Sequence, residues 1–488
     1  MKRISFVLVI VMSLLCWGQT SQSAQTQSPT QPPPPVQEPA PQKGPGAQGT
    51  TDAQVQPEHR ISKAEEKELL DSVSAILKIQ SEDTALPVKH EVKRQLTSRD
   101  DVEKFFVDRF RKDEAAQKLK RSEVVLKKFG LIPRDFYLEG FMLELLREQV
   151  AGYYNADNRT VYLLDWIDPD QQKPVLAHEL THALQDQNFK LEKWSKTGLA
   201  GEKKVQDEIQ SDEQLAARDA VLEGQAMTAM LDYMLAPTGQ SVLTSPLLVK
   251  ATEVGMTSGG GSPVYDKAPL YLQQALIFPY TYGMDFTVTL LKNGGKEKAY
   301  ADVFRNPPQN TREIMQPETY LAGEKLPPLT IPDFKNILGH DWDRYDVGSI
   351  GEFDVSIMGQ QYGMKHDESE KLASGWRGGY YYAAVKHGTK DPKTTDTSVV
   401  FVTKWATPEQ AEQFKKVYLG YLPKRYAAVT SSHDPGETYR KYGTTEGTVI
   451  ASQKDGLLIF TESFDDETAQ KLMQAVEGTE AKGLEAKP

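Results

Sequence analysis

The sequence predicts an α+β protein: a mainly helical domain with one small antiparallel hairpin, followed by a smaller C-terminal α+β domain. Apolar residues recur at helical spacing in several segments between residues 61 and 348. Two β-prone runs flank an Asn/Asp-rich turn within residues 150–164. After residue 349, four short strand-like runs are accompanied by two helical segments.

The N-terminus has the parts of a secretory signal peptide. Lys2 and Arg3 supply positive charge, residues 6–17 form a short apolar core, and small residues at Ser23 and Ala24 suit cleavage. We therefore predict a signal peptide at residues 1–24 and export to the periplasm or the cell exterior. An uncleaved membrane anchor is the alternative, which the shortness of the apolar stretch disfavours.

The single cysteine of the chain, Cys16, lies inside this signal. Cleavage downstream would leave a mature chain without a disulfide or a catalytic thiol. A lipid anchor through Cys16 is the alternative. Leu15 disfavours it, because a small residue is expected directly before a lipidated cysteine.

Residues 25–60 are predicted to be a disordered linker, because this Pro- and Gln-rich stretch cannot bury a core. The helical domain then covers residues 61–348, and the C-terminal domain covers residues 349–488. The first helices are predicted at 65–79, 102–111 and 138–148. The sequence leaves open whether residues 61–130 act as a prosegment.

Charge and hydropathy exclude several classes of protein. The formal net charge of -11 argues against nucleic acid and against anionic membrane surfaces as the main partner. No internal apolar run reaches the roughly 18 residues that a membrane-spanning helix needs. We therefore predict no transmembrane segment in the mature chain. The oligomeric state is not determined by the sequence.

The predicted hairpin pairs residues 150–154 with residues 159–164 across the turn at 155–158. It lies directly before the next predicted helix. Two interpretations remain open at this stage. A free strand edge could pair with an extended peptide through main-chain hydrogen bonds, or the hairpin could simply pack on that helix.

Residues 178–182 read His-Glu-Leu-Thr-His in a segment that is predicted to be helical, with Pro174 in its first turn. Helical spacing places His178 and His182 on one face, with Glu179 beside them. Two imidazoles can hold zinc, and a neighbouring carboxylate can take a proton from zinc-bound water. The alternative is a core helix whose histidines bond to the backbone or to carboxylates.

A catalytic zinc ion needs three protein ligands, and Glu223 is the candidate for the third. It lies in an otherwise apolar helical run at residues 213–235, where a buried carboxylate is costly without a cation. The alternative is a surface-facing glutamate on an amphipathic helix. Asp219, four positions earlier on the same helix face, could orient a ligand.

The string at residues 178–182 resembles the signature of the gluzincin metallopeptidases. Glu223-Gly224-Gln225-Ala226 resembles the Glu-Gly-x-Ala pattern in which many of them place their glutamate ligand. The resemblance covers residues 150–235. It implies a zincin-like metallopeptidase domain, one Zn²⁺ per chain on His178, His182 and Glu223, and Glu179 as the general base. It also implies a peptide or protein substrate, with the hairpin as the substrate-binding edge strand.

The chain departs from the thermolysin-like pattern in two ways. The gap between His182 and Glu223 is longer, and no acidic residue stands four positions after Glu223. Outside residues 150–235, three stretches resemble segments that recur in secreted bacterial proteins with this motif, although they carry no known chemistry. These stretches are residues 306–311, 316–320 and 375–378.

Peptide hydrolysis also needs a donor that stabilises the oxyanion, for which Tyr280, Tyr282 and His340 are candidates. Two other functions remain open. One is a catalytically inactive zincin-fold binding protein with a structural zinc, and the other is a surface-interaction protein that acts through its C-terminal domain. The presence of Glu179 argues against a structural zinc, because metal binding does not need that carboxylate.

Overall fold

The computed structural model describes residues 60–485, except for 113, 150–151, 197–204, 258–261 and 433–438. The predicted signal peptide and, apart from Arg60, the predicted linker lie outside these residues. In the part of the chain that is described, no helix is both long and apolar enough to cross a membrane.

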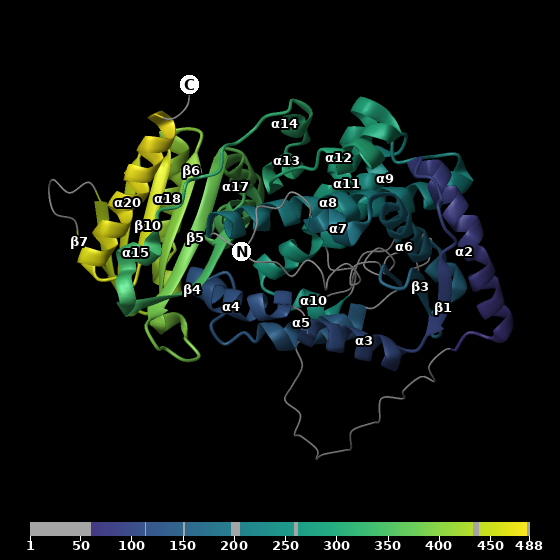
Figure 1. The fold of residues 1–488 in the computed structure, drawn as a ribbon, viewed down its shortest axis with the longest axis horizontal. Helices are drawn as coiled ribbons and strands as arrows, with labels where there is room; N and C mark the ends of the chain where they lie inside the picture. Colours follow the sequence, from purple (N-terminus) through teal and green to yellow (C-terminus); the bar gives the residue numbers. More distant parts are fainter. Residues whose placement is uncertain are drawn as a thin grey trace, which may run out of the picture.

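The predicted α+β class is confirmed. Helices dominate the chain up to Leu338, and a seven-stranded antiparallel sheet dominates the remainder (Figure 1). In order, the first part contains α2 (Lys63–Thr84), β1 (Lys93–Thr97), α3 (Arg99–Lys112), α4 (Glu114–Phe129), α5 (Leu138–Gln149), β2 (Tyr153–Asn155), β3 (Thr160–Leu164), α6 (Pro169–Phe189), α7 (Leu191–Lys196), α8 (Val205–Leu235), α9 (Pro246–Thr257), α10 (Pro263–Asp266), α11 (Leu270–Glu297), a π-helix (Lys298–Asp302), α12 (Val303–Arg305), α13 (Thr311–Met315), α14 (Pro317–Leu321) and α15 (Phe334–Leu338).

The second part contains the strands of the large sheet and the helices between them. They are β4 (Trp342–Ser349), α16 (Glu352–Gln361), α17 (His366–Ala373), β5 (Trp376–Lys386), β6 (Thr397–Trp405), α18 (Pro408–Gly420), α19 (Leu422–Arg425), β7 (Val429–Ser432), β8 (Tyr439–Thr444), β9 (Gly447–Lys454), β10 (Leu457–Glu462) and α20 (Asp466–Glu485).

The predicted hairpin is confirmed as β2 and β3, which pair antiparallel with Tyr154 opposite Val161. A third strand, β1, pairs parallel with β3 and was not predicted. The strand order β1-β3-β2 leaves β2 at one edge of this small sheet.

The prediction that Pro174 lies in the first turn of the motif helix was wrong. Helix α6 begins at Pro169, and the Asp168 side chain caps it by accepting from the Asp170 N–H at 2.9 Å. The first N–H groups of a helix have no partner within it, so proline costs little at Pro169. Helix α11 begins at Leu270 and likewise contains a proline, Pro279, in its interior.

Helix α2 is part of the core of the helical region. One of its faces buries Leu69, Val73 and Ile76. The buried Gln80 side chain accepts a hydrogen bond from Thr181 Oγ1 at 3.2 Å and donates to the Ala229 carbonyl at 3.4 Å. This glutamine therefore joins α2 to both α6 and α8.

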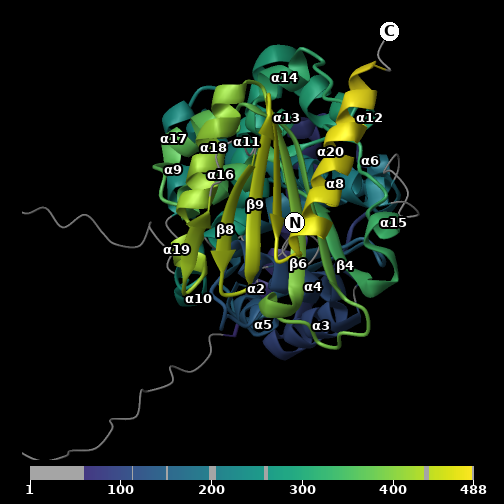
Figure 2. The ribbon, with the colours of Figure 1, turned by 90° about the vertical axis from the view of Figure 1, so that its left-hand side faces the viewer.

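The large sheet has the order β4-β5-β6-β10-β9-β8-β7 and is covered by helices on both faces (Figure 2). Alternate residues of β6 enter different cores. Val400 and Val402 pack in the cluster that includes residues of α15 and α20, whereas Phe401 contacts Phe129 of α4 and Phe414 of α18. The sheet begins at β4, before the domain boundary predicted at residue 349.

The four strands predicted after residue 349 correspond to β5, β6, β9 and β10. The edge strands β4 and β7, and β8 beside β7, were not predicted. Their sequences lack a clear apolar alternation, and their pairing partners hold them in the sheet.

A buried cluster of charges fixes α4 against this sheet. Arg425 Nη2 lies 2.5 Å from Glu462 Oε1, and both side chains are fully buried. Arg425 Nη1 also donates to the Lys128 carbonyl at 3.1 Å. The buried Lys128 ammonium donates to Glu446 Oε2 at 2.9 Å and to Ser463 Oγ at 2.7 Å. The helical region and the sheet are therefore joined by polar contacts as well as by apolar packing.

Helices α8 and α11 touch through their backbones at Gly224 and Gly283. A Cβ atom added to Gly224 would lie 2.0 Å from the Gly283 carbonyl oxygen, and one added to Gly283 would lie 2.2 Å from the Ala220 oxygen. Only glycine permits this approach, which fixes where the two helices cross.

We predict that Gly224→Ala lowers the free energy of unfolding by about 1–3 kcal/mol or more, because the two backbones must move apart. Gly255→Ala on α9 is the matched control, since nothing lies within 4 Å of an added Cβ there. It should be neutral or raise stability by up to about 1 kcal/mol. Urea unfolding of both variants tests this, and equal stabilities would contradict the proposed contact.

We predict that Arg425→Met lowers the free energy of unfolding by about 3–5 kcal/mol, because it leaves the Glu462 carboxylate buried without its cation. The double variant Arg425→Met/Glu462→Leu should recover part of this loss. Lys471→Met removes an exposed partner of Glu467 and should leave the urea midpoint unchanged. If Arg425→Met is as stable as the double variant, the prediction is refuted.

Candidate metal centre

Helices α6 and α8 bring the three predicted ligands together. Glu223 Oε2 lies 3.2 Å from His178 Nε2 and 3.5 Å from His182 Nε2. The two Nε2 atoms are 3.1 Å apart. Within the described residues, His178, His182 and Glu223 form a group whose ligand atoms all lie within 4.8 Å of one another. This group could hold a metal ion.

The group lies in the protein core. The exposed fractions are 1% for His178, 5% for His182 and 2% for Glu223. Glu223 is therefore not a surface-facing residue of an amphipathic helix, which was the alternative for it. Its carboxylate needs a cationic partner at this depth.

The donor atoms suit a divalent cation. Two imidazole nitrogens and one carboxylate oxygen make a ligand set typical of zinc. Glu179, beside them, is 1% exposed, and its Oε1 has no hydrogen-bond partner among the described residues. Such a buried polar atom is typical of a place where water or an ion belongs.

Electrostatics link the four residues. Burial alone would lower the pKa of His182, but the charge and hydrogen bond of Glu223 outweigh it and raise that pKa to about 9. Burial would raise the pKa of Glu223, but the two histidines outweigh it and lower that pKa to about 2. Burial lowers the pKa of His178 and raises that of Glu179 to about 8. Without a metal, a proton on His182 therefore balances the charge of Glu223.

The edge strand β2 contacts the motif helix directly. The Tyr154 N–H donates to Glu179 Oε2 at 2.8 Å, and Tyr154 Oη donates to Asp186 Oδ2 at 3.1 Å. The hairpin is thus packed on α6 through its main chain, at the candidate general base Glu179. No sequence signal singled out Tyr154, although the hairpin and the helix are neighbours in the chain.

One of the three candidate oxyanion donors lies at the site. The buried Tyr280 ring stacks on His178 with ring centroids 6.4 Å apart. Burial and the charges of Glu223, Glu179 and Asp219 raise the pKa of Tyr280 well above its usual value, so it stays protonated. Asp219 thus acts electrostatically on Tyr280.

The other two donor candidates lie elsewhere. Tyr282 donates to Glu370 instead. His340 is exposed in a 3₁₀ turn, Gly339–Asp341, that leads into β4. Neither contacts the candidate ligands, because the side chain two residues along a helix points to another face and His340 belongs to the sheet region.

Gln185 was missed by the sequence analysis. Its Oε1 lies 2.8 Å from His182 Nδ1. The two residues are three positions apart on α6, so they share a helix face. That spacing was a signal that could have identified Gln185.

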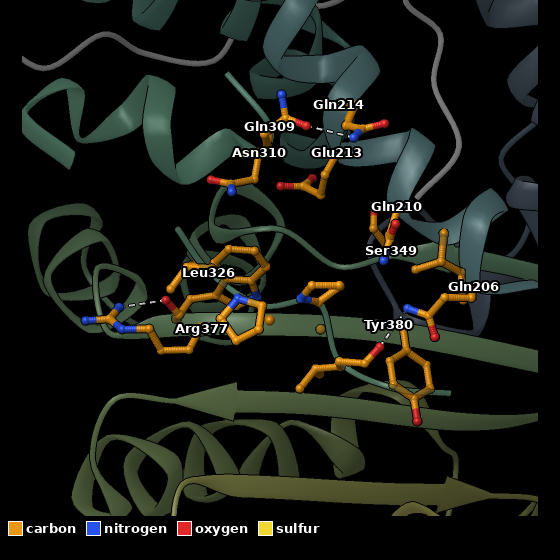
Figure 3. A pocket seen from close by; sticks show the side chains of 17 residues that line it. Gln206, Gln210, Glu213, Gln214, Gln309, Asn310, Leu326, Ser349, Arg377 and Tyr380 are labelled. Carbon is orange, nitrogen blue, oxygen red and sulfur yellow. Dashed lines mark hydrogen bonds between the residues drawn. The ribbon is translucent and has the colours of Figure 1, made fainter. Parts of the chain in front are cut away.

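A separate cavity of about 240 Å³ lies between the first turns of α8, the segment before α15 and the start of β5 (Figure 3). Its lining includes Glu213 on α8. It also includes Gln309, Asn310 and Arg377, from two of the stretches noted in the sequence. None of the candidate ligands lines this cavity, so it is distinct from the candidate metal centre.

A comparison with family models matches residues 342–472 to a domain of unknown function, DUF8575. The match spans β4 to the first turns of α20, which is the large sheet and its helices. Neither the curated proteins nor the solved structures gave a significant match. The matched domain therefore does not include His178, His182 or Glu223, and the similarity assigns no chemistry to them.

Proposed function

We propose that this chain is an exported, zinc-dependent metallopeptidase that hydrolyses peptide bonds in a peptide or protein substrate. The observation that carries the proposal is the convergence of His178, His182 and Glu223 in the core, with the Glu179 carboxylate beside them. The gluzincin-like motifs support the same conclusion. The export part rests on the signal-like sequence at residues 1–24 alone.

The three ligands would hold one zinc ion, which when bound supplies a Lewis acid that activates water and polarises the scissile carbonyl. Glu179 takes the proton of the attacking water and passes it to the leaving amine. Its Oε2 is held by the Tyr154 N–H, which leaves Oε1 for this proton transfer. Tyr280 is the candidate donor to the oxyanion, since its ring stacks on His178 and its hydroxyl is protonated.

The burial of the centre favours a second candidate. Closed metal centres are typical of structural zinc, and every ligand here is at most 5% exposed. In that case the chain would be a catalytically inactive binding protein with a zincin fold. Glu179 argues for the enzyme, because a structural zinc has no use for a buried carboxylate that carries no ligand role.

We predict that the purified protein holds one zinc ion per chain and that a chelator lowers its thermal stability. Metal that binds only the folded state adds about 2.7 kcal/mol when free zinc is 100 times its dissociation constant. Elemental analysis and thermal unfolding with and without zinc measure this. In His182→Ala, added zinc should no longer shift the unfolding temperature. A wild-type protein that binds no zinc would contradict the proposal.

We predict that Glu179→Gln keeps its zinc but cleaves an unstructured protein about 10²–10⁴-fold more slowly, because the amide cannot take a proton. Glu352→Gln replaces a buried glutamate outside the centre and should cleave like the wild type. Cleavage rates at equal zinc content test both. Equal rates for wild type and Glu179→Gln would refute the mechanism, and a zinc-loaded but inert wild type would favour the structural-zinc protein.

A further inference from the structure

A chain of hydrogen bonds between buried side-chain amides connects His182 to the core. His182 Nδ1 lies 2.8 Å from Gln185 Oε1, and Gln185 Nε2 donates to Gln225 Oε1 at 2.8 Å. Gln225 Nε2 then donates to the Ala299 carbonyl at 2.6 Å. Both glutamine side chains are fully buried. The chain crosses from α6 to α8 and ends in the π-helix that follows α11.

The orientation of the two glutamine amides is fixed where the hydrogen-bond chain ends, at the Ala299 carbonyl. A backbone carbonyl only accepts, so the nitrogen of Gln225 must face Ala299 and its oxygen must face Gln185. Gln185 Nε2 also donates to the Leu222 carbonyl at 3.1 Å, which again places nitrogen on that side. The Gln185 oxygen is therefore the atom that faces His182.

The orientation of the Gln185 amide determines which nitrogen of His182 is available to bind a metal. An amide oxygen only accepts, so His182 Nδ1 carries a proton whether the imidazole is neutral or charged. The lone pair of the neutral ring is then on Nε2, the atom that faces His178 and Glu223. By contrast, His178 Nδ1 has no hydrogen-bond partner among the described residues. The chain thus orients one of the two histidines.

We propose that Gln185 is a positioning residue of the metal centre and that Gln225 and the Ala299 carbonyl fix its orientation. This inference rests on the proposed zinc centre. It adds the residues that fix the orientation of the His182 ring. The π-helix at Lys298–Asp302 contributes the carbonyl that ends the chain, and π-turns inside helical segments are frequent at functional sites.

A matched control distinguishes the proposed positioning role of Gln185 from a purely structural one. Gln80 is also a fully buried glutamine, and it too joins α6 to α8, through Thr181 Oγ1 and the Ala229 carbonyl. It contacts no candidate ligand in these bonds. Gln80→Met therefore removes comparable buried hydrogen bonds without changing the partner of His182.

The test compares the zinc affinity of wild type, Gln185→Met and Gln80→Met by chelator competition. We expect Gln185→Met to bind zinc about 10–100-fold more weakly, as is usual when the partner of a ligating histidine is lost. Gln80→Met should be less stable but should bind zinc like the wild type. The His182 Nδ1 proton of the zinc-loaded protein, followed by NMR, should be protected from exchange in all but Gln185→Met.

Equal zinc affinities for Gln185→Met and Gln80→Met would overturn this inference and leave the zinc centre standing. A wild type that binds no zinc would overturn the proposed function, and this inference with it. If Gln185→Met does not fold, Gln225→Met decides the matter, because it removes one of the two oxygen atoms that hold the Gln185 amide nitrogen away from His182. Its zinc affinity should fall below that of Gln80→Met, and an unchanged value would again overturn the inference.

Discussion

The buried carboxylate of Glu223 constrains the whole helical region. A carboxylate that is 2% exposed cannot stay charged without a cation, so the fold must bring positive charge to it. The two histidines of α6 meet this need, either with a proton on His182 or as ligands of a metal ion. Around them, the hydrogen bonds of Gln185, Tyr154 and Gln80 tie neighbouring elements to α6.

The geometry of that site depends on how closely the helices approach. Gly224, directly after Glu223, lies against the backbone of Gly283, and this contact brings α11 next to α8. Tyr280 lies one turn before Gly283 on α11, so the same contact places its ring over His178. Larger residues at either glycine would separate the carboxylate from the tyrosine. The site and the helix crossing are therefore a single structural feature.

Buried ion pairs, rather than a close contact of helix backbones, join the large sheet to the helical region. The buried charges form two ion pairs between elements that are distant in the chain, Arg425 with Glu462 and Lys128 of α4 with Glu446. They hold α4 on the sheet and so link the matched domain of unknown function to the helical region. The candidate metal ligands lie in the helical region, on α6 and α8.

The sequence by itself determined the features that depend on local spacing. The four-residue spacing of His178 and His182 placed both rings on one helix face, and the continuous apolar runs of β6 and β10 identified strands. The Asn/Asp-rich turn at residues 155–158 identified the hairpin. The start of the motif helix was less well predicted, since Pro174 lies inside α6, which begins at Pro169.

Only the tertiary structure decided which distant residues meet. Spacing alone does not distinguish a buried ligand from a surface glutamate at Glu223, because the packing of α8 on α6 determines its burial. That packing also supplied Gln225. Contacts of α11, β2 and the π-helix with these two helices brought Tyr280, Tyr154 and the Ala299 carbonyl to the site, and left Tyr282 and His340 away from it. Such contacts join segments far apart in the chain, and no spacing within one segment encodes them.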